Sequence, residues 1–182
     1  NYIVFDLEWN QCPYGKGQEN ERIPFEIIEI GAVKLNEERE KVAEFHRIIR
    51  PCVYRQMHRI ISEVTHVSIE ELERDGEPFA AVMEDFLKWC GEDCIFCTWG
   101  SMDLTELQRN MVYHGMTIPF PKPFLFYDVQ KLYSLCYQDG KARISLDEAV
   151  ESFALDVDAP FHRALGDAEY TGRVMRAMDF ES

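Results

Sequence analysis

The sequence contains no long apolar run, and this absence excludes a membrane-spanning helix. None of its hydrophobic stretches approaches the roughly 20 residues that a helix needs to cross a bilayer. A secretory signal is also missing, because the N-terminus has the pattern of a strand and not of a charged and then apolar segment. We therefore expect a cytoplasmic protein that does not contact a membrane. The chain starts at Asn1 and not at an initiating Met, which is typical of a fragment.

Positive charge is scarce, since 19 Lys and Arg stand against 33 Asp and Glu and the net charge is −14. Such a chain is not expected to coat long nucleic acids by neutralising their phosphates. The charge still allows an enzyme that holds a few nucleotides at one end, where bound metal ions supply positive charge. The arginines are concentrated between residues 46 and 66, which include Arg47, Arg50, Arg55 and Arg59. This basic segment is either a solvated loop or a phosphate contact.

The six cysteines do not indicate a disulfide framework. Without a secretory signal, reduced thiols are expected. Cys90, Cys94 and Cys97 lie close together and raise the question of a zinc site. A structural zinc needs four ligands and no fourth ligand lies nearby, so we expect free thiols.

Hydrophobic periodicity predicts a mixed α/β fold over residues 1–182, which contain no long linker, repeat or low-complexity segment. Three strands come first, joined as an antiparallel meander, and helices then alternate with strands in a sheet of about five strands. The expected strands cover residues 2–7, 25–35, 41–51, 93–100 and 123–128. The expected helices cover residues 67–76, 78–91, 101–115, 129–140, 145–155 and 162–180, with Ser101 and Ser145 as N-caps.

Two carboxylates interrupt the first, otherwise apolar strand. Asp6 and Glu8 are spaced by two residues, so they project from the same face. Two like charges at the end of a buried strand repel each other, and burying them without compensation costs several kcal/mol. The strand itself contains no Lys or Arg. We therefore expect a cation, and hard oxygen ligands favour Mg²⁺ or Mn²⁺.

Two further acids stand at notable positions. Asp103 lies where an apolar strand gives way to a helix, and Asp167 lies in the last helix, five residues after His162. Taken singly, each acid is explained by the favourable charge at a helix start, and His162 by a surface position. Taken together, the four carboxylates are typical of a two-metal centre, in which the ions stand about 3.5–4 Å apart.

Three motifs resemble those of the DEDDh 3′→5′ exonucleases, relatives of RNase T and of the proofreading subunit of bacterial DNA polymerase III. These motifs are DLEW at residues 6–9, WGSMDL at residues 99–104 and HRALGDA at residues 162–168. EIIEIGAVKL and ISEVTHVS extend the resemblance over nearly the whole chain, and TWGSMDL is most similar to the branch that trims histone mRNA. The resemblance implies an RNase H-like sheet flanked by helices in one exonuclease domain, residues 1–182.

The resemblance also implies roles for five residues. Asp6, Glu8, Asp103 and Asp167 would bind two divalent cations, Mg²⁺ or Mn²⁺, and His162 would be the general base. Asp6 would bridge the two ions, and Asp103 would act through water. The expected reaction releases nucleoside 5′-monophosphates from the 3′ end of single-stranded RNA or of short overhangs.

Substrate contacts are implied for Trp9, Thr65, His66 and Met102. Trp9 also suits a packing role at the rim of the site, and Met102 replaces an aromatic residue that is common in RNA-directed relatives. RNA is favoured over DNA, although recognition of the 2′-hydroxyl depends on geometry. Two alternatives remain, a DNA proofreading or repair exonuclease of the same fold and a catalytically silent nucleic-acid-binding module. All five chemical positions are filled, which disfavours the silent module.

Overall fold

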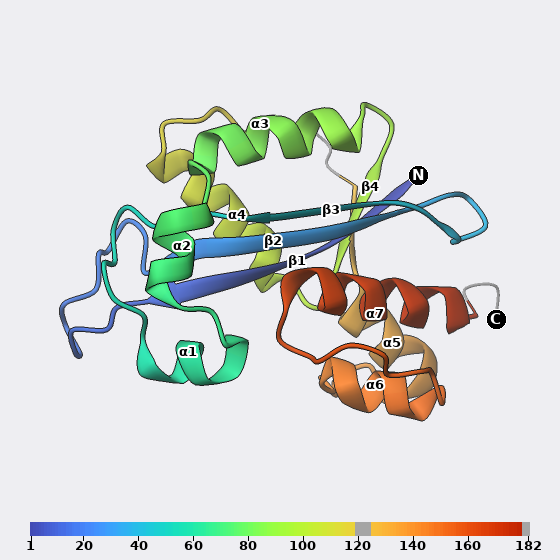
Figure 1. Ribbon diagram of the computed structural model, residues 1–182. Coiled ribbons are helices and arrows are strands. Elements are labelled where there is room, and N and C mark those ends of the chain that lie inside the picture. The colour runs from blue at the N-terminus through green and yellow to red at the C-terminus, as the bar shows by residue number, and fades with distance from the viewer. Residues whose placement is uncertain (119–124, 180–182) are drawn as a thin grey trace.

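The structure is a computed structural model that describes residues 1–118 and 125–179 (Figure 1). A five-stranded mixed sheet has the order β3-β2-β1-β4-β5. The first three strands form an antiparallel meander, while β4 pairs parallel to β1 and β5 pairs parallel to β4. The strands are β1 (Tyr2–Gln11), β2 (Phe25–Leu35), β3 (Lys41–Ile48), β4 (Ile95–Thr98) and β5 (Phe126–Asp128). The expected fold class is therefore confirmed.

The first strand is longer than its apolar pattern predicts. β1 continues to Gln11 because it stays paired with β2 as far as Phe25, across a β-bulge between Glu8 and Trp9. Asp6 and Glu8 thus lie inside the strand and not at its end, which corrects the expected boundary. The strand expected over residues 123–128 begins at Phe126, and residues 123 and 124 lie outside the described residues.

Seven helices are described, and their bounds are α1 (Arg59–Thr65), α2 (Ile69–Asp75), α3 (Phe79–Cys90), α4 (Met102–Tyr113), α5 (Val129–Tyr137), α6 (Leu146–Ser152) and α7 (Ala164–Ala177). The sequence did not predict α1, which is short and has no side-chain cap at His58. Ser145 caps α6 in a capping box with Glu148, as expected. Ser101 stands at the N-cap of α4, but its side chain makes no capping hydrogen bond. The last helix begins at Ala164, so His162 precedes it.

The helices cover both faces of the sheet. α3 and α4 pack on one face through Phe86 and Leu107, and α5, α6 and α7 pack on the other face through residues such as Tyr133 and Val174 (Figure 1). Within the described residues, no helix combines the length and apolar character needed to cross a membrane. All six cysteines are free thiols, as expected.

One glycine brings α7 unusually close to the sheet. Gly31 of β2 is paired with Asp6 on one side and with His46 on the other. A Cβ atom at Gly31 would collide with the backbone of Ala164 and Leu165, at the start of α7. The absence of a side chain therefore allows the first turn of α7 to rest on the strand next to Asp6.

Candidate active site

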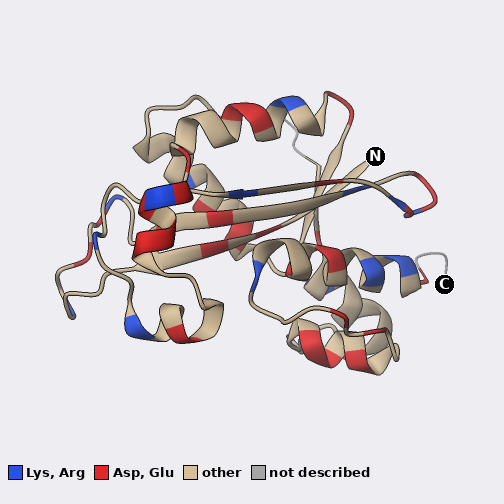
Figure 2. Cartoon of the chain, viewed as in Figure 1, with Lys and Arg blue, Asp and Glu red and all other residues tan. Residues whose placement is uncertain are grey.

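The sheet and α7 bring three carboxylates together. Asp6 and Glu8 project from the same face of β1, and Asp167 lies in the first turn of α7. Each of the three offers a carboxylate oxygen, and these oxygens all lie within 4.8 Å of one another. Figure 2 shows that acidic residues stand on the central strands and on α7, and not only on exposed helix faces.

Asp103 approaches the same group from α4. Its Oδ1 atom accepts a hydrogen bond of 3.0 Å from the backbone N–H of Leu7, which lies between the two acids of β1. The residue is 7% exposed, so its role is not limited to a favourable charge at the start of α4. The four acids expected from the sequence therefore surround one region of β1.

Burial and repulsion between neighbouring carboxylates raise the pKa values of all four acids. Burial, followed by repulsion from Asp103, raises the pKa of Asp6 well above its usual value. Burial and the charge of Asp167 raise the pKa of Glu8 to about 8. Burial also raises the pKa of Asp103 to about 7 and that of Asp167 to about 6. The positive charge of a bound cation would offset the repulsion between these carboxylates.

The chemistry of the donors fits a divalent cation. The Oδ2 atom of Asp6 is buried and has no hydrogen-bond partner among the described residues. A buried carboxylate oxygen without a partner is costly, and a metal ion satisfies it. The donors are all carboxylate oxygens, which suit Mg²⁺ or Mn²⁺ better than softer metals.

His162 lies at the edge of this group. It is exposed and its backbone is in the left-handed region, with φ at 66°. Its backbone N–H donates to both carboxylate oxygens of Asp167, at 3.1 and 3.2 Å. Asp167 therefore fixes the turn that carries His162 while leaving the imidazole accessible to solvent.

An ion pair that the sequence did not predict lies beside the four acids. Glu29 of β2 lies opposite Glu8 and its side chain is 1% exposed. Oε2 of Glu29 lies 3.1 Å from Nε of Arg163, and Oε1 lies 2.9 Å from Nε2 of His46. Burial raises the pKa of Glu29, but the hydrogen bonds from His46 and Arg163 outweigh it and lower the pKa overall. A glutamate inside the apolar run FEIIEIGAV was the available signal.

The residues expected to contact substrate differ in how accessible they are. Met102 is 53% exposed and stands next to Asp103 at the first position of α4. Trp9 packs against Phe25, with ring centroids 5.8 Å apart, so the packing role is observed. His66 is exposed and caps α1 with φ at 58°.

Thr65 does not suit the expected role. It is 1% exposed, and its hydroxyl donates a hydrogen bond of 2.8 Å to the carbonyl oxygen of Ile61. The hydroxyl oxygen of Thr65 also accepts a hydrogen bond of 3.2 Å from the N–H of Val67. Its side chain therefore stabilises the end of α1 and has no surface to offer a substrate. Of the two expected contacts in this segment, His66 remains accessible.

Comparisons with known proteins identify the family of the chain. The family model described as exonuclease, RNase T, matches residues 3–175. The probable 3′-5′ exonuclease KapD of Bacillus subtilis is 27% identical over 171 residues, which cover 91% of this chain and 78% of KapD.

Two solved structures show the same fold. The nuclease domain of 3′hExo, a DEDDh family member bound to rAMP, has a TM-score of 0.80 at 22% identity, over 97% of this chain and 90% of that one. Pop2p of S. pombe, in its Mg²⁺- and Mn²⁺-bound form, has a TM-score of 0.71 at 16% identity, over 96% of this chain and 81% of that one.

Proposed function

Because the chain belongs to the RNase T family of exonucleases, we propose that its four clustered acids bind two divalent cations and that it removes nucleotides one at a time from 3′ ends. The observation that carries this proposal is the meeting of Asp6, Glu8 and Asp167 within 4.8 Å, beside an Asp6 oxygen that has no described partner. The roles of Asp103 and His162 are part of the same proposal.

The residues of the chain have two different roles in the proposed hydrolysis. When bound, divalent cations at the carboxylates would lower the pKa of the attacking water and stabilise the leaving 3′-oxygen. When cations are bound, their positive charge would be held next to the terminal phosphate by Asp6, Glu8, Asp103 and Asp167. His162 accepts the proton of the attacking water at an imidazole nitrogen, which its exposed position allows. The products are a nucleoside 5′-monophosphate and a strand that is one nucleotide shorter.

We propose single-stranded RNA as the preferred substrate, with short overhangs as a further form. The structural likeness to 3′hExo bound to rAMP motivates the choice of RNA for the first test. Mg²⁺ or Mn²⁺ is supported by the donor set and by the likeness to Pop2p, which binds both ions. Met102, His66 and the backbone at Trp9 are the proposed contacts to the terminal nucleotide. A cytoplasmic site of action stays a prediction.

The test is digestion of single strands that carry a fluorophore at the 5′ or the 3′ end, in Mg²⁺, Mn²⁺ or EDTA. A ladder that shortens from the 3′ end and requires metal supports the proposal, and the faster of matched RNA and DNA strands identifies the substrate. Asp6→Asn should abolish the ladder, while Asp75→Asn on the exposed end of α2 should not. If folded protein cleaves nothing with either metal, a nucleic-acid-binding module becomes the better explanation.

A further inference from the structure

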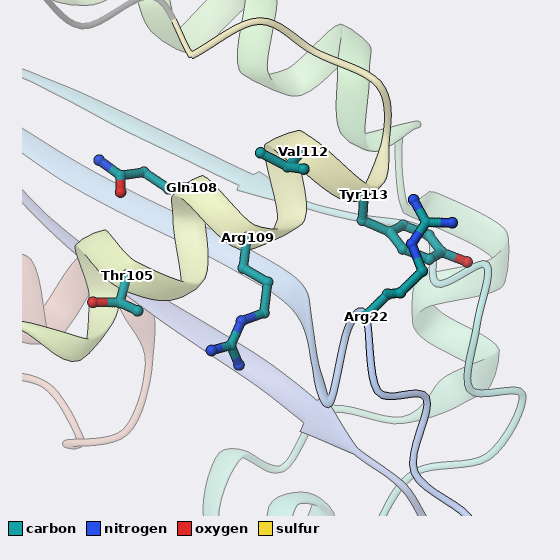
Figure 3. Close-up of a pocket in the computed structure, with 6 residues that line it drawn as sticks. All are labelled: Arg22, Thr105, Gln108, Arg109, Val112 and Tyr113. Atoms are coloured by element: carbon teal, nitrogen blue, oxygen red, sulfur yellow. The ribbon is translucent and has the colours of Figure 1, made fainter.

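A pocket lies along the exposed face of α4, the helix that begins next to Asp103. It has a volume of about 380 Å³ and combines two arginines with polar and apolar side chains (Figure 3). Its lining residues are Arg22, Thr105, Gln108, Arg109, Val112 and Tyr113. None of them belongs to the proposed metal centre, so the pocket needs its own explanation.

The pocket continues the surface on which Met102 is exposed. Thr105 and Arg109 follow Met102 at spacings of three and seven residues, which place all three side chains on one face of α4. Asp103 and Arg109 are six residues apart, which corresponds to about 9 Å along the helix axis. Arg109 therefore lies within two helical turns of Asp103, and the pocket extends from there toward the C-terminal end of α4.

Its two guanidinium groups are held in different ways. Nη1 of Arg109 lies 3.1 Å from Oε1 of Glu106, whose side chain is only 3% exposed, so this ion pair fixes Arg109 on α4. The guanidinium carbon of Arg22 lies 5.3 Å from the centroid of the Tyr113 ring (Figure 3). Arg22 is exposed and makes no ion pair with any of residues 1–118 or 125–179. Its charge is therefore available in a protein whose net charge is −14.

The loop that carries Arg22 is anchored to the fold. The hydroxyl of Tyr54 accepts a hydrogen bond of 3.1 Å from the N–H of Asn20 and donates one of 3.1 Å to the carbonyl oxygen of Ile23. These bonds hold the backbone on both sides of Arg22. A positioned cation loses less conformational freedom when it binds an anion than a cation on a free loop does.

We propose that this pocket binds the nucleic-acid strand on the 5′ side of the linkage that is cut, with Arg22 and Arg109 contacting backbone phosphates. Guanidinium groups suit phosphate oxygens through paired hydrogen bonds, and Val112, which is 56% exposed, offers an apolar contact to a sugar or base. The inference rests on the proposed function, because the strand must run from the carboxylate cluster across Met102 to reach the pocket. The pocket would bind the part of the substrate that stays on the protein after the terminal nucleotide leaves.

The test compares Arg22→Gln with Arg176→Gln, which removes the same charge at the far end of α7. Two substrates are used with Mn²⁺: a single strand of about 12 nucleotides, and a p-nitrophenyl ester of a nucleoside 5′-monophosphate, which has no 5′ neighbour. In Arg22→Gln, the ratio of kcat/KM on the strand to kcat/KM on the ester should fall about fivefold. The dependence of log(kcat/KM) on log[salt] should become shallower by about 0.7 for each lost phosphate contact.

A second variant tests the other arginine without leaving a buried acid unpaired. The double substitution Glu106→Gln with Arg109→Gln removes the ion pair as a whole, and should lower the same ratio. If Arg22→Gln and Arg176→Gln change the ratio equally, or if neither changes it, the inference is wrong while the exonuclease proposal stands.

Binding measured without turnover separates the two proposals. Anisotropy of a 5′-fluorescent strand in EDTA should show weaker affinity for Arg22→Gln than for Arg176→Gln even if no nucleotide is released. If the wild type also releases no nucleotide in Mg²⁺ or Mn²⁺, the exonuclease proposal fails and the strand-binding pocket remains. Equal affinities of the two variants would overturn the pocket.

Discussion

Arg163 and Glu29 connect the turn before α7 to the centre of the sheet. Nε of Arg163 lies 3.1 Å from Oε2 and 3.3 Å from Oε1 of Glu29, whose side chain is 1% exposed. Arg163 directly follows His162, so this ion pair restrains the backbone that carries the proposed general base. Asp167 restrains the same turn from the other side through the N–H of His162.

We therefore predict that Glu29→Gln affects both stability and turnover. The amide is neutral and has only one oxygen to accept the hydrogen bonds of Arg163 and His46. The free energy of unfolding should therefore fall by about 1–3 kcal/mol. Because the turn carrying His162 loosens, kcat should fall about tenfold with a smaller change in KM. Chemical unfolding and steady-state digestion measure the two effects.

Glu77→Gln is the matched control for this prediction. Glu77 also pairs with an arginine, Arg47, at 3.3 Å, but both side chains are well exposed. Its loss should cost less than about 1 kcal/mol and leave kcat unchanged. Equal effects of the two substitutions on kcat would argue against a positioning role for Glu29.

Asp6→Asn should stabilise the metal-free protein while removing its activity. The substitution removes one charge from a cluster of acids and replaces an oxygen that has no described partner. In EDTA, the free energy of unfolding should rise by about 1–2 kcal/mol, and kcat in Mn²⁺ should fall by at least about 10²-fold. The rise in melting temperature that Mn²⁺ gives the wild type should shrink. A variant that is less stable than the wild type in EDTA would contradict the assignment.

The raised pKa values predict a specific pH dependence for the metal-free protein. An acid whose pKa is higher in the folded state than in the unfolded state binds more protons when folded, so stability falls as pH rises through that interval. The intervals run from 4.5 to about 8 for Glu8, from 3.8 to about 7 for Asp103 and from 3.8 to about 6 for Asp167. In EDTA, these groups should therefore lower the free energy of unfolding between about pH 4 and about pH 8.

Other acids titrate in the opposite sense, so the comparison needs a variant. The difference in unfolding free energy between the wild type and Asp6→Asn/Glu8→Gln, both in EDTA, isolates the cluster. As pH rises, the wild type should lose stability relative to the variant. Saturating Mg²⁺ should reverse this trend. A difference that is independent of pH would show that folding does not raise the pKa values of these acids.

His162 gives a prediction that separates chemistry from backbone strain. His162→Ala and His162→Gly both remove the imidazole, so kcat should fall by about 10²- to 10⁴-fold in each. Because φ at this position is 66°, glycine should be the more stable of the two, by about 1 kcal/mol. Thermal unfolding of the pair measures the difference. Near-normal turnover in either variant would remove His162 from the proposed mechanism.

The sequence predicted those parts of the fold and site that depend on local pattern. The largely apolar run FEIIEIGAVKL defined β2. The spacing of Asp6 and Glu8 placed them on one face because side chains alternate along a strand. The capping box at Ser145 was equally local. These features depend on neighbouring residues only.

What the sequence did not predict depends on contacts between distant segments. The extension of β1 to Gln11 follows from pairing with Phe25 across a bulge, and the burial of Thr65 follows from the packing of a helix without a strong local signal. The pairing of Glu29 with Arg163 joins residues that are 134 positions apart. No periodicity in either segment contains that information.

Gly31 determines how far apart the proposed metal ligands stand. Asp6 and Glu8 are carried by a strand and Asp167 by a helix, so their separation depends on how closely that helix approaches the sheet. At Gly31 the backbone of α7 lies so close that a single added methyl group would act as a spacer between two parts of the proposed coordination site. A residue without a side chain thus limits the distance between the carboxylates to which the proposed cations would have to fit.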